Sequence, residues 1–324
     1  MARSLTIKTP PDYLFFRDAC SYGYFLLAPN LWSPAERTLT RPLDLPGGMA
    51  TFRIAQPGGK GRPLAASSDR SLTKKDKAEA ERLVTRMLRL DDAGVAEFHR
   101  VDRRWKRSGR GRLFRSPTFF EDLVKTVTSC NVTWPSTVGM NRRLCELINP
   151  AFPRPSQMAR RRPSELRARC GVGYRDRRLV ELARMVASGD LDVARLEDPA
   201  TSDEEAYKTL LDLPGIGPYG AGNLMQLLGR YSRLALDTES IRHAKNVLGM
   251  RGAERVLLRR LQRHYEPFGD HRFRSYWFEL WTFYESKHGP AWTWEPKKTG
   301  TAFTAAKLNS ARQGGVASPR NGRR

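Results

Sequence analysis

The sequence predicts a mostly α-helical protein, α+β overall, with a small antiparallel β domain before a larger helical core. β-favouring residues cluster or alternate in the first part of the chain, between Pro- and Gly-rich turns. From Thr73 to about Tyr284, apolar residues recur instead at helical spacing. We therefore expect the β domain at residues 1–70 and the helical core at residues 71–296.

Within the β domain, strands are expected at residues 22–28, 38–45 and 49–55, with Pro46-Gly-Gly as one of the turns between them. The change to a helical period is clearest in one run of apolar residues: Ala80, Leu83, Val84, Met87, Leu88 and Leu90. Residues 106–115 contain five basic residues and no acidic one. We expect a loop or arm there rather than part of the core.

Positive charge is the most unusual feature of the composition. The 324 residues include 57 Lys and Arg against 34 Asp and Glu, which gives a net charge of +23. No acidic residue follows Glu295, and the seven basic residues beyond it leave +16 on residues 1–296. We expect the tail at residues 297–324 to be disordered, either as a solvated end or as a loose contact to nucleic acid. The charge on the folded part indicates a polyanionic partner, nucleic acid before an acidic membrane surface.

Several protein classes are excluded by the same composition. The four cysteines, Cys20, Cys130, Cys145 and Cys170, form no close pair, which favours buried thiols over a disulfide framework or a zinc knuckle. No apolar run approaches the roughly 18 residues of a bilayer span, and residues 1–9 lack the apolar core of a signal peptide. We expect an intracellular monomer, located in the cytoplasm or nucleoid if the source is bacterial.

The most specific local pattern is a helix-hairpin-helix at residues 206–228. A short helix is expected before Leu213-Pro-Gly-Ile-Gly, a tight turn whose glycines allow positive φ, and Pro218 suits the first position of the next helix. Such a hairpin points backbone N–H groups at a DNA phosphate without reading a base. The expected DNA-binding residues are Leu213, Gly215, Ile216, Gly217 and Tyr219. The carbonyls of Leu211, Leu213 and Ile216 are candidate ligands for K⁺ or Na⁺.

Asp237 is the candidate catalytic residue. It follows an apolar strip and precedes a helical pattern, so its carboxylate is expected at a helix N-terminus. By itself that is the position of an ordinary helix cap. It lies twenty residues after Gly217, the last glycine of the hairpin turn, and this combination with the hairpin makes a role beyond the cap worth considering.

Together these features resemble the helix-hairpin-helix DNA glycosylases, the HhH-GPD superfamily, in which the hairpin precedes a catalytic Asp. Residues 116–131 look like the first helix of the glycosylase core, and residues 170–175 look like its Gly-Tyr-Arg turn. A sheet before the helices is similar to the branch that contains 8-oxoguanine glycosylase and 3-methyladenine glycosylase II. The resemblance covers roughly residues 5–290.

The resemblance implies a role for each residue that matches a family motif. Asp237 would stabilise the cationic sugar that forms as the N-glycosidic bond breaks, or would orient the attacking water. Asn131 would fill the gap left by the flipped nucleotide, Tyr174 would wedge beside it and Arg175 would contact the orphaned partner base. Each also fits a structural role: Asn131 bridging helices, Tyr174 in the core, Arg175 as a surface cation.

Three departures from the family pattern limit the chemistry. Members that also cut the DNA strand carry a Lys where this chain has Tyr219, and a phenol forms no imine. We therefore expect base release without lyase activity, with Lys208 and Lys245 as alternative nucleophiles. Ser136 stands where the oxoguanine branch has a second Arg against the partner base. No Cys follows Cys170, so we expect no iron–sulfur cluster and no other cofactor.

Aromatic residues near the end of the helical region are candidates for the base pocket. Tyr219, Trp277 and Trp281 are the candidates, and a core stripe that includes Phe278 and Tyr284 is the alternative. His243 faces either DNA phosphate or solvent.

The expected function is a DNA N-glycosylase of base excision repair that flips out an alkylated or oxidised base from double-stranded DNA and releases it by hydrolysis. The main alternative is a non-catalytic helix-hairpin-helix DNA-binding protein, which would need the hairpin and the charge without Asp237. A basic membrane-surface protein would need an amphipathic helix with a continuous apolar face, and the sequence favours DNA instead.

Overall fold

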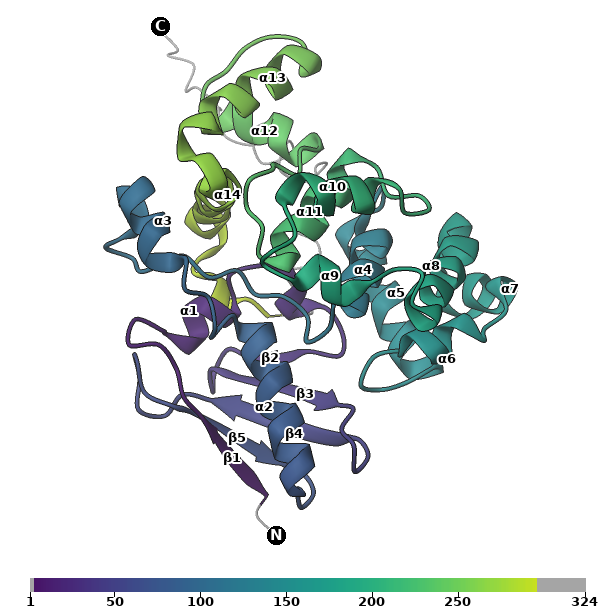
Figure 1. Cartoon of the computed structure of the whole chain (residues 1–324). Helices are drawn as coiled ribbons and strands as arrows, with labels where there is room; N and C mark the ends of the chain where they lie inside the picture. The colour runs from purple at the N-terminus through teal and green to yellow at the C-terminus, as the bar shows by residue number, and fades with distance from the viewer. Residues whose placement is uncertain (1–2, 296–324) are drawn as a thin grey trace, which may run out of the picture.

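The computed structural model describes residues 3–295, which form a helical body with a small sheet at one end (Figure 1). The basic tail at residues 297–324 lies outside the described residues. The strands are β1 (Ser4–Ile7), β2 (Leu31–Ser33), β3 (Thr38–Leu43), β4 (Ala50–Ala55) and β5 (Leu64–Ser68). This architecture confirms the predicted α+β class.

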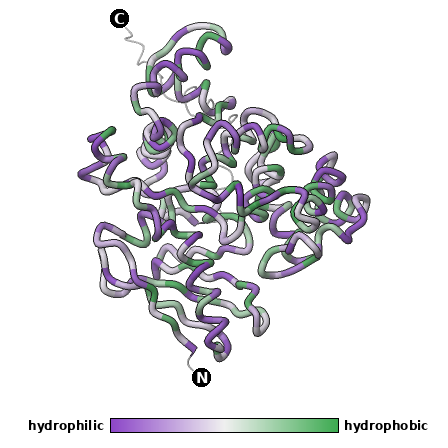
Figure 2. Tube along the Cα trace, in the orientation of Figure 1, coloured by the Kyte–Doolittle hydropathy of each residue, from purple (hydrophilic) through white to green (hydrophobic). Residues whose placement is uncertain are grey.

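The helices follow in chain order, mostly after the sheet. They are α1 (Phe15–Ala19), α2 (Lys74–Leu88), α3 (Val95–Val101), α4 (Phe119–Ser129), α5 (Trp134–Leu147), α6 (Pro155–Ala159), α7 (Pro163–Glu165), α8 (Asp176–Ser188), α9 (Val193–Glu197), α10 (Asp203–Leu211), α11 (Pro218–Leu228), α12 (Thr238–Asn246), α13 (Glu254–Tyr265) and α14 (Arg272–His288). Short helical turns are η1 (Gly23–Leu26), η2 (Arg103–Trp105), η3 (Leu166–Cys170, a π-turn), η4 (Gly173–Arg175), η5 (Glu266–His271) and η6 (Ala291–Thr293). Hydrophobic and hydrophilic residues alternate along these helices (Figure 2), as expected of helices with one buried face.

The sheet is antiparallel throughout, in the order β1-β5-β4-β3-β2. β3 and β4 confirm the strands expected at residues 38–45 and 49–55. Along β4 the side chains of Phe52 and Ile54 are buried, while Arg53 between them is exposed, as in a sheet with one face on the core. Helix α2 lies across the sheet (Figure 1) and begins after the Thr73 side chain, which accepts a hydrogen bond from the Asp76 N–H.

The strand expected at residues 22–28 is wrong. This segment contains η1, and the side chains from Tyr24 to Leu27 are all buried, so no alternation of exposed and buried faces exists there. The hydroxyls of Tyr22 and Tyr24 bond to residues of the helical core rather than leaving the segment free to join the sheet. The sequence predicted a strand here because aromatic residues are common in strands. The long-range hydrogen bonds that hold the segment in another conformation leave no local pattern in the sequence.

Residues 106–115 form a loop, as expected, but its second half is part of the core, which corrects the prediction. Leu113 and Phe114 are buried, and the backbone N–H of Arg115 donates to the Met87 carbonyl of α2 at 3.2 Å. The arginines beside them are buried too: Arg112 pairs with Asp12 at 2.6 Å, and Arg115 donates to the Leu227 carbonyl at 2.9 Å. Basic residues enter the interior here because each has an oxygen partner.

Helix α4, which carries the site residues at its end, is held against the sheet by buried charges. Glu121 of α4 accepts from Arg41 of β3 at 3.0 Å and from Lys125 at 2.6 Å, and all three side chains are almost fully buried. Cys20, Cys145 and Cys170 are buried, Cys130 is half-buried and none forms a disulfide. Within residues 3–295, no helix combines the length and the apolar character that a membrane span requires.

Candidate active site

The hairpin forms at the expected residues, with α10 and α11 joined by residues 212–217. Gly215 has φ +73°, which favours glycine, and Pro218 occupies the first turn of α11. The side chains of Leu213 and Ile216 are buried and anchor the turn, while Gly215 and Gly217 are exposed. The turn therefore offers main-chain groups, rather than side chains, to a ligand.

A cavity of about 610 Å³ opens beside this turn. Five segments line it: η1, the α4–α5 turn, the hairpin, the start of α12 and α14. Among the predicted site residues, the lining includes Asn131, Gly215, Gly217, Tyr219, Asp237, Trp277 and Trp281. Tyr174, Arg175, Leu213 and Ile216 do not line the cavity. Residues from 22 to 284 thus meet at one pocket.

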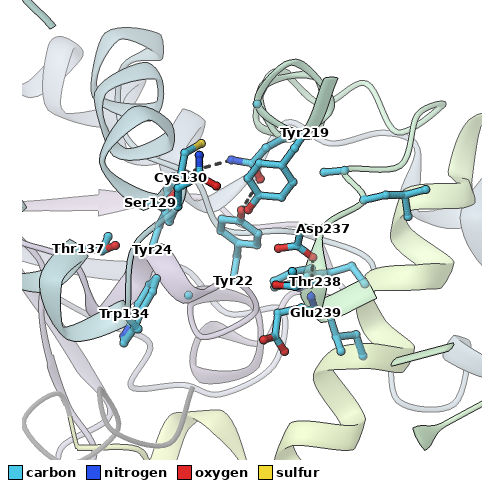
Figure 3. A pocket seen from close by; sticks show the side chains of 18 of the residues that line it. Tyr22, Tyr24, Ser129, Cys130, Trp134, Thr137, Tyr219, Asp237, Thr238 and Glu239 are labelled. Atoms are coloured by element: carbon cyan, nitrogen blue, oxygen red, sulfur yellow. Dashed lines mark hydrogen bonds between the residues drawn. The ribbon is translucent and has the colours of Figure 1, made fainter. Parts of the chain in front are cut away.

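Asp237 is both a helix cap and a pocket residue. Its Oδ1 accepts hydrogen bonds from the backbone N–H groups of Glu239 (3.0 Å) and Ser240 (3.1 Å), and from the Ser240 hydroxyl at 3.2 Å. Within residues 3–295, the hydrogen bonds to its carboxylate all fall on Oδ1, and Figure 3 shows the other carboxylate oxygen pointing into the cavity. Burial raises the pKa of this carboxyl, and the hydrogen bonds from Ser240 oppose that rise.

A buried polar cluster forms the floor of the pocket, and sequence reasoning missed it. The Tyr22 hydroxyl donates to Asn223 Oδ1 at 2.5 Å, and Asn223 Nδ2 donates to Thr126 Oγ1 at 3.0 Å and to the Tyr24 hydroxyl at 3.2 Å. Tyr24 belongs to η1, Tyr22 precedes it, and the other two side chains come from α4 and α11. No sequence signal joins them, because they lie about one hundred residues or more apart.

Aromatic rings form the walls. Trp277 stacks on Trp281 with ring centroids 5.4 Å apart and contacts Tyr22 at 4.6 Å, and its Nε1 donates to the Ser21 carbonyl at 2.8 Å. Trp134, which the sequence analysis did not single out, also lines the cavity and lies against Gly23, where a Cβ atom would be 3.1 Å from the ring. Figure 3 shows Tyr22, Trp134 and Tyr219 around the space that Asp237 faces.

A second carboxylate, that of Glu239, also lines the cavity. It accepts a hydrogen bond from the Tyr284 hydroxyl and pairs with Arg242 at 2.7 Å. Burial raises the pKa of Glu239. Within the described residues, no lysine, arginine or histidine lines the cavity. Its electrostatic character is therefore set by two carboxylates and by the electron-rich faces of aromatic rings.

The two expected wedge residues lie on the protein surface. Asn131 is exposed at the α4–α5 turn with φ +54°, and it lines the edge of the pocket. Tyr174 is 54% exposed, which excludes the core alternative, and the guanidinium groups of Arg175 and Arg178 lie over its ring at 4.4 and 5.4 Å. The role of Tyr174 as a wedge stays a prediction.

Arg175 is buried, so the surface-cation alternative is wrong, and the contact with an orphaned base stays a prediction. It is 5% exposed, and its guanidinium donates to the carbonyls of Val127 (3.1 Å), Cys130 (2.5 Å) and Val172 (3.3 Å). The Arg175 guanidinium thereby supplies hydrogen-bond donors to carbonyls at the C-terminal end of α4, which have no partner within the helix. Arg175 fixes the end of α4, from which Asn131 projects.

The remaining candidates lie away from the reaction space. Lys208 and Lys245 are exposed and do not line the cavity, and Ser136 is exposed beside Thr133. His243 is 1% exposed and its Nε2 lies 2.8 Å from the Tyr265 hydroxyl, so it faces neither DNA nor solvent. Its ring packs among buried aromatic residues that are distant in the sequence, so the local sequence gave no sign of its burial.

Burial lowers the pKa of His243 to about 4, and the nearby His264 adds to this effect. Because the folded-state pKa lies below the usual value of about 6.5, the stability linked to this residue is present above that value and is lost as the pH falls toward 4. We expect the free energy of unfolding to fall by about 2 kcal/mol from this residue alone between about pH 7.5 and pH 5. Urea unfolding at the two pH values measures it, and His243→Gln should show a correspondingly smaller change. An equal pH dependence in both proteins would contradict the assignment.

The carbonyls proposed for a monovalent cation remain a prediction. The Leu213 carbonyl accepts the Ile216 N–H at 3.1 Å, which leaves a second lone pair for a ligand. Within residues 3–295, no cluster of three or more His, Cys, Asp or Glu side chains suits a metal ion.

Comparison of the fold identifies the architecture. No protein-family model matches the sequence, and neither does any curated protein. The structure is similar to the 3-methyladenine DNA glycosylase from Archaeoglobus fulgidus, with 18% identity, a TM-score of 0.67 and coverage of 86% of this chain and 99% of that one. MBOgg1 in complex with a low-affinity DNA ligand gives 16% identity, a TM-score of 0.66 and coverage of 89% and 97%. The 8-oxoguanine glycosylase/lyase from Clostridium acetobutylicum in its apo form has 15% identity, a TM-score of 0.58 and coverage of 88% of this chain and 100% of that one. These neighbours are helix-hairpin-helix DNA glycosylases, and the chain has their fold, as the sequence resemblance predicted.

Proposed function

We propose that this protein is a DNA N-glycosylase that removes a damaged base by hydrolysis and leaves the DNA strand intact. The observation that carries the proposal is the position of the Asp237 carboxylate in the aromatic cavity beside the hairpin. One of its oxygens caps α12, which holds the carboxylate in place, and the other oxygen faces the cavity. A charge fixed there stabilises the positive charge that develops on the sugar as the base leaves. The glycosylase fold, the net charge of +23 and the exposed hairpin turn support DNA as the substrate.

The pocket favours an electron-poor base, of the kind that alkylation of a purine ring produces. Two carboxylates and the faces of Tyr22, Trp134 and Trp277 surround the space, and the described lining includes no cationic side chain. A positively charged ring binds to aromatic faces more strongly than a neutral one. We therefore propose an alkylated base before an oxidised one, with water as the acceptor of the sugar.

The test is incubation of the protein with duplexes that each carry one alkylated, oxidised or deaminated base, scored for abasic product. Release of an alkylated base at the highest single-turnover rate is the expected result. Binding of the duplexes without release of any base would favour the alternative, a non-catalytic DNA-binding protein.

Strand cleavage should be absent. Tyr219 stands beside the cavity where a lysine nucleophile would be needed, and burial raises the pKa of its phenol well above the usual value. We expect products that show a nick only after alkali or heat, and little covalent complex after borohydride treatment. Efficient trapping of the wild-type protein would contradict this expectation and would direct attention to Lys208 and Lys245.

A further inference from the structure

A second depression, of about 780 Å³, lies among α6, α7 and η3. Arg160, Arg161, Arg162 and Arg169 line it, and Glu165 is the acidic residue in its described lining. Figure 1 shows α6 and α7 at one side of the molecule, beside α5 and α8 and away from α12 and α13. Nothing in the proposed base-release chemistry uses this surface.

The charge of the depression is only partly compensated. Glu165 is shared between Arg161 at 3.4 Å and Arg169 at 3.6 Å. Arg160 and Arg162 are exposed, and neither forms an ion pair with any residue of the described chain. Four arginines against one carboxylate on a concave surface make a strong local site for anions, since guanidinium groups bind phosphate oxygens in pairs.

The position of the depression relative to the active site follows from α5. Trp134, the first residue of that helix, lines the reaction cavity, and Ile148, directly after its last residue, lines the depression. Fourteen residues at about 1.5 Å each separate the two by about 21 Å. That distance equals about six base-pair steps of B-form DNA.

The two surfaces are also continuous along the chain. Helix η3 ends at Cys170, directly before the turn that presents Tyr174, and the Arg143 side chain ties these segments together by donating to the Cys170 carbonyl at 2.8 Å. The arginine-lined depression therefore lies on the segment of chain that leads directly into the Tyr174 turn.

We infer that this arginine-lined depression binds backbone phosphates of duplex DNA about six base pairs from the flipped nucleotide, on one side of it only. The inference rests on the proposed function for the position of the lesion. Duplex DNA is favoured over a free anion because the arginines lie at a spacing from the pocket that a continuous backbone spans.

The test uses Arg160→Gln combined with Arg162→Gln, because neither side chain forms an ion pair in the described structure. The probes are duplexes with a reduced abasic site and unequal arms, about 4 base pairs on one side and about 12 on the other, made in both orientations. For one orientation, the slope of log Kd against log salt should become shallower by about 1.8, or about 0.9 for each phosphate that the variant no longer neutralises. The opposite orientation should bind as it does to the wild type.

Arg255→Gln combined with Arg259→Gln removes the same charge from the exposed face of α13 and serves as the matched control. An equal loss for both orientations, or for the control pair, would show a general effect of net charge and overturn the inference. Unchanged binding would show a solvated surface and overturn it as well. If the wild-type protein does not prefer the abasic duplex to an undamaged one, it is the proposed function that fails.

Discussion

Asp237→Asn is expected to release base about 100 to 1000 times more slowly than the wild type in single turnovers, because it removes a preorganised charge from the reaction space. The variant should remain folded. Asn caps helices about as well as Asp, and the hydrogen bonds from Glu239 and Ser240 fall on one oxygen, which Asn retains.

The stability of this variant tests the same geometry in a second way. Burial raises the pKa of Asp237, so keeping this carboxylate charged costs the folded protein stability. Removing the charge should therefore leave the melting temperature unchanged or raise it, as is common for groups that serve function at the expense of stability. A fall in melting temperature with undiminished base release would identify Asp237 as a cap alone.

Glu239→Gln is the control, since it alters the neighbouring carboxylate and leaves Asp237 in place. Glu239 is already engaged by Tyr284 and Arg242, whereas Asp237 keeps an oxygen free. We expect the control to retain most of the single-turnover rate. If it loses as much as Asp237→Asn, Glu239 shares the catalytic role.

The sequence predicted those features that depend on local patterns. The hairpin residues carry their conformation in glycine and proline, and the cap at Asp237 depends on residues within three positions of it. The aromatic residues Trp277 and Trp281 were found because they recur at helical spacing, and the structure places both at the pocket.

Features that depend on distant partners were missed or misassigned. Asn223 gave no signal, although it joins Tyr22, Tyr24 and Thr126 at the pocket floor, because its partners are spread over the chain. Arg175 looked like a surface cation or a DNA ligand, because sequence does not show which carbonyls lie nearby. Long polar side chains are the hardest to place, since one guanidinium serves protein or nucleic acid equally well.

Arg175 therefore gives the second prediction with a large effect. Arg175→Met should lower the free energy of unfolding by about 3 kcal/mol or more, since it leaves several buried carbonyls without a donor. Urea or thermal unfolding measures this loss. Tyr174→Ala is a suitable comparison, because that side chain is mostly exposed and its removal should cost little stability.

The effect of Arg175→Met on DNA distinguishes the structural role from contact with the partner base. Because Arg175 holds the end of α4 from which Asn131 projects, its loss should slow base release by a similar factor whichever base lies opposite the lesion. A residue that read the orphaned base would instead leave stability intact and change the ranking of opposite bases. Unfolding curves and single-turnover rates against all four opposite bases separate the two outcomes, and a stable variant with an altered ranking would restore the direct contact with DNA.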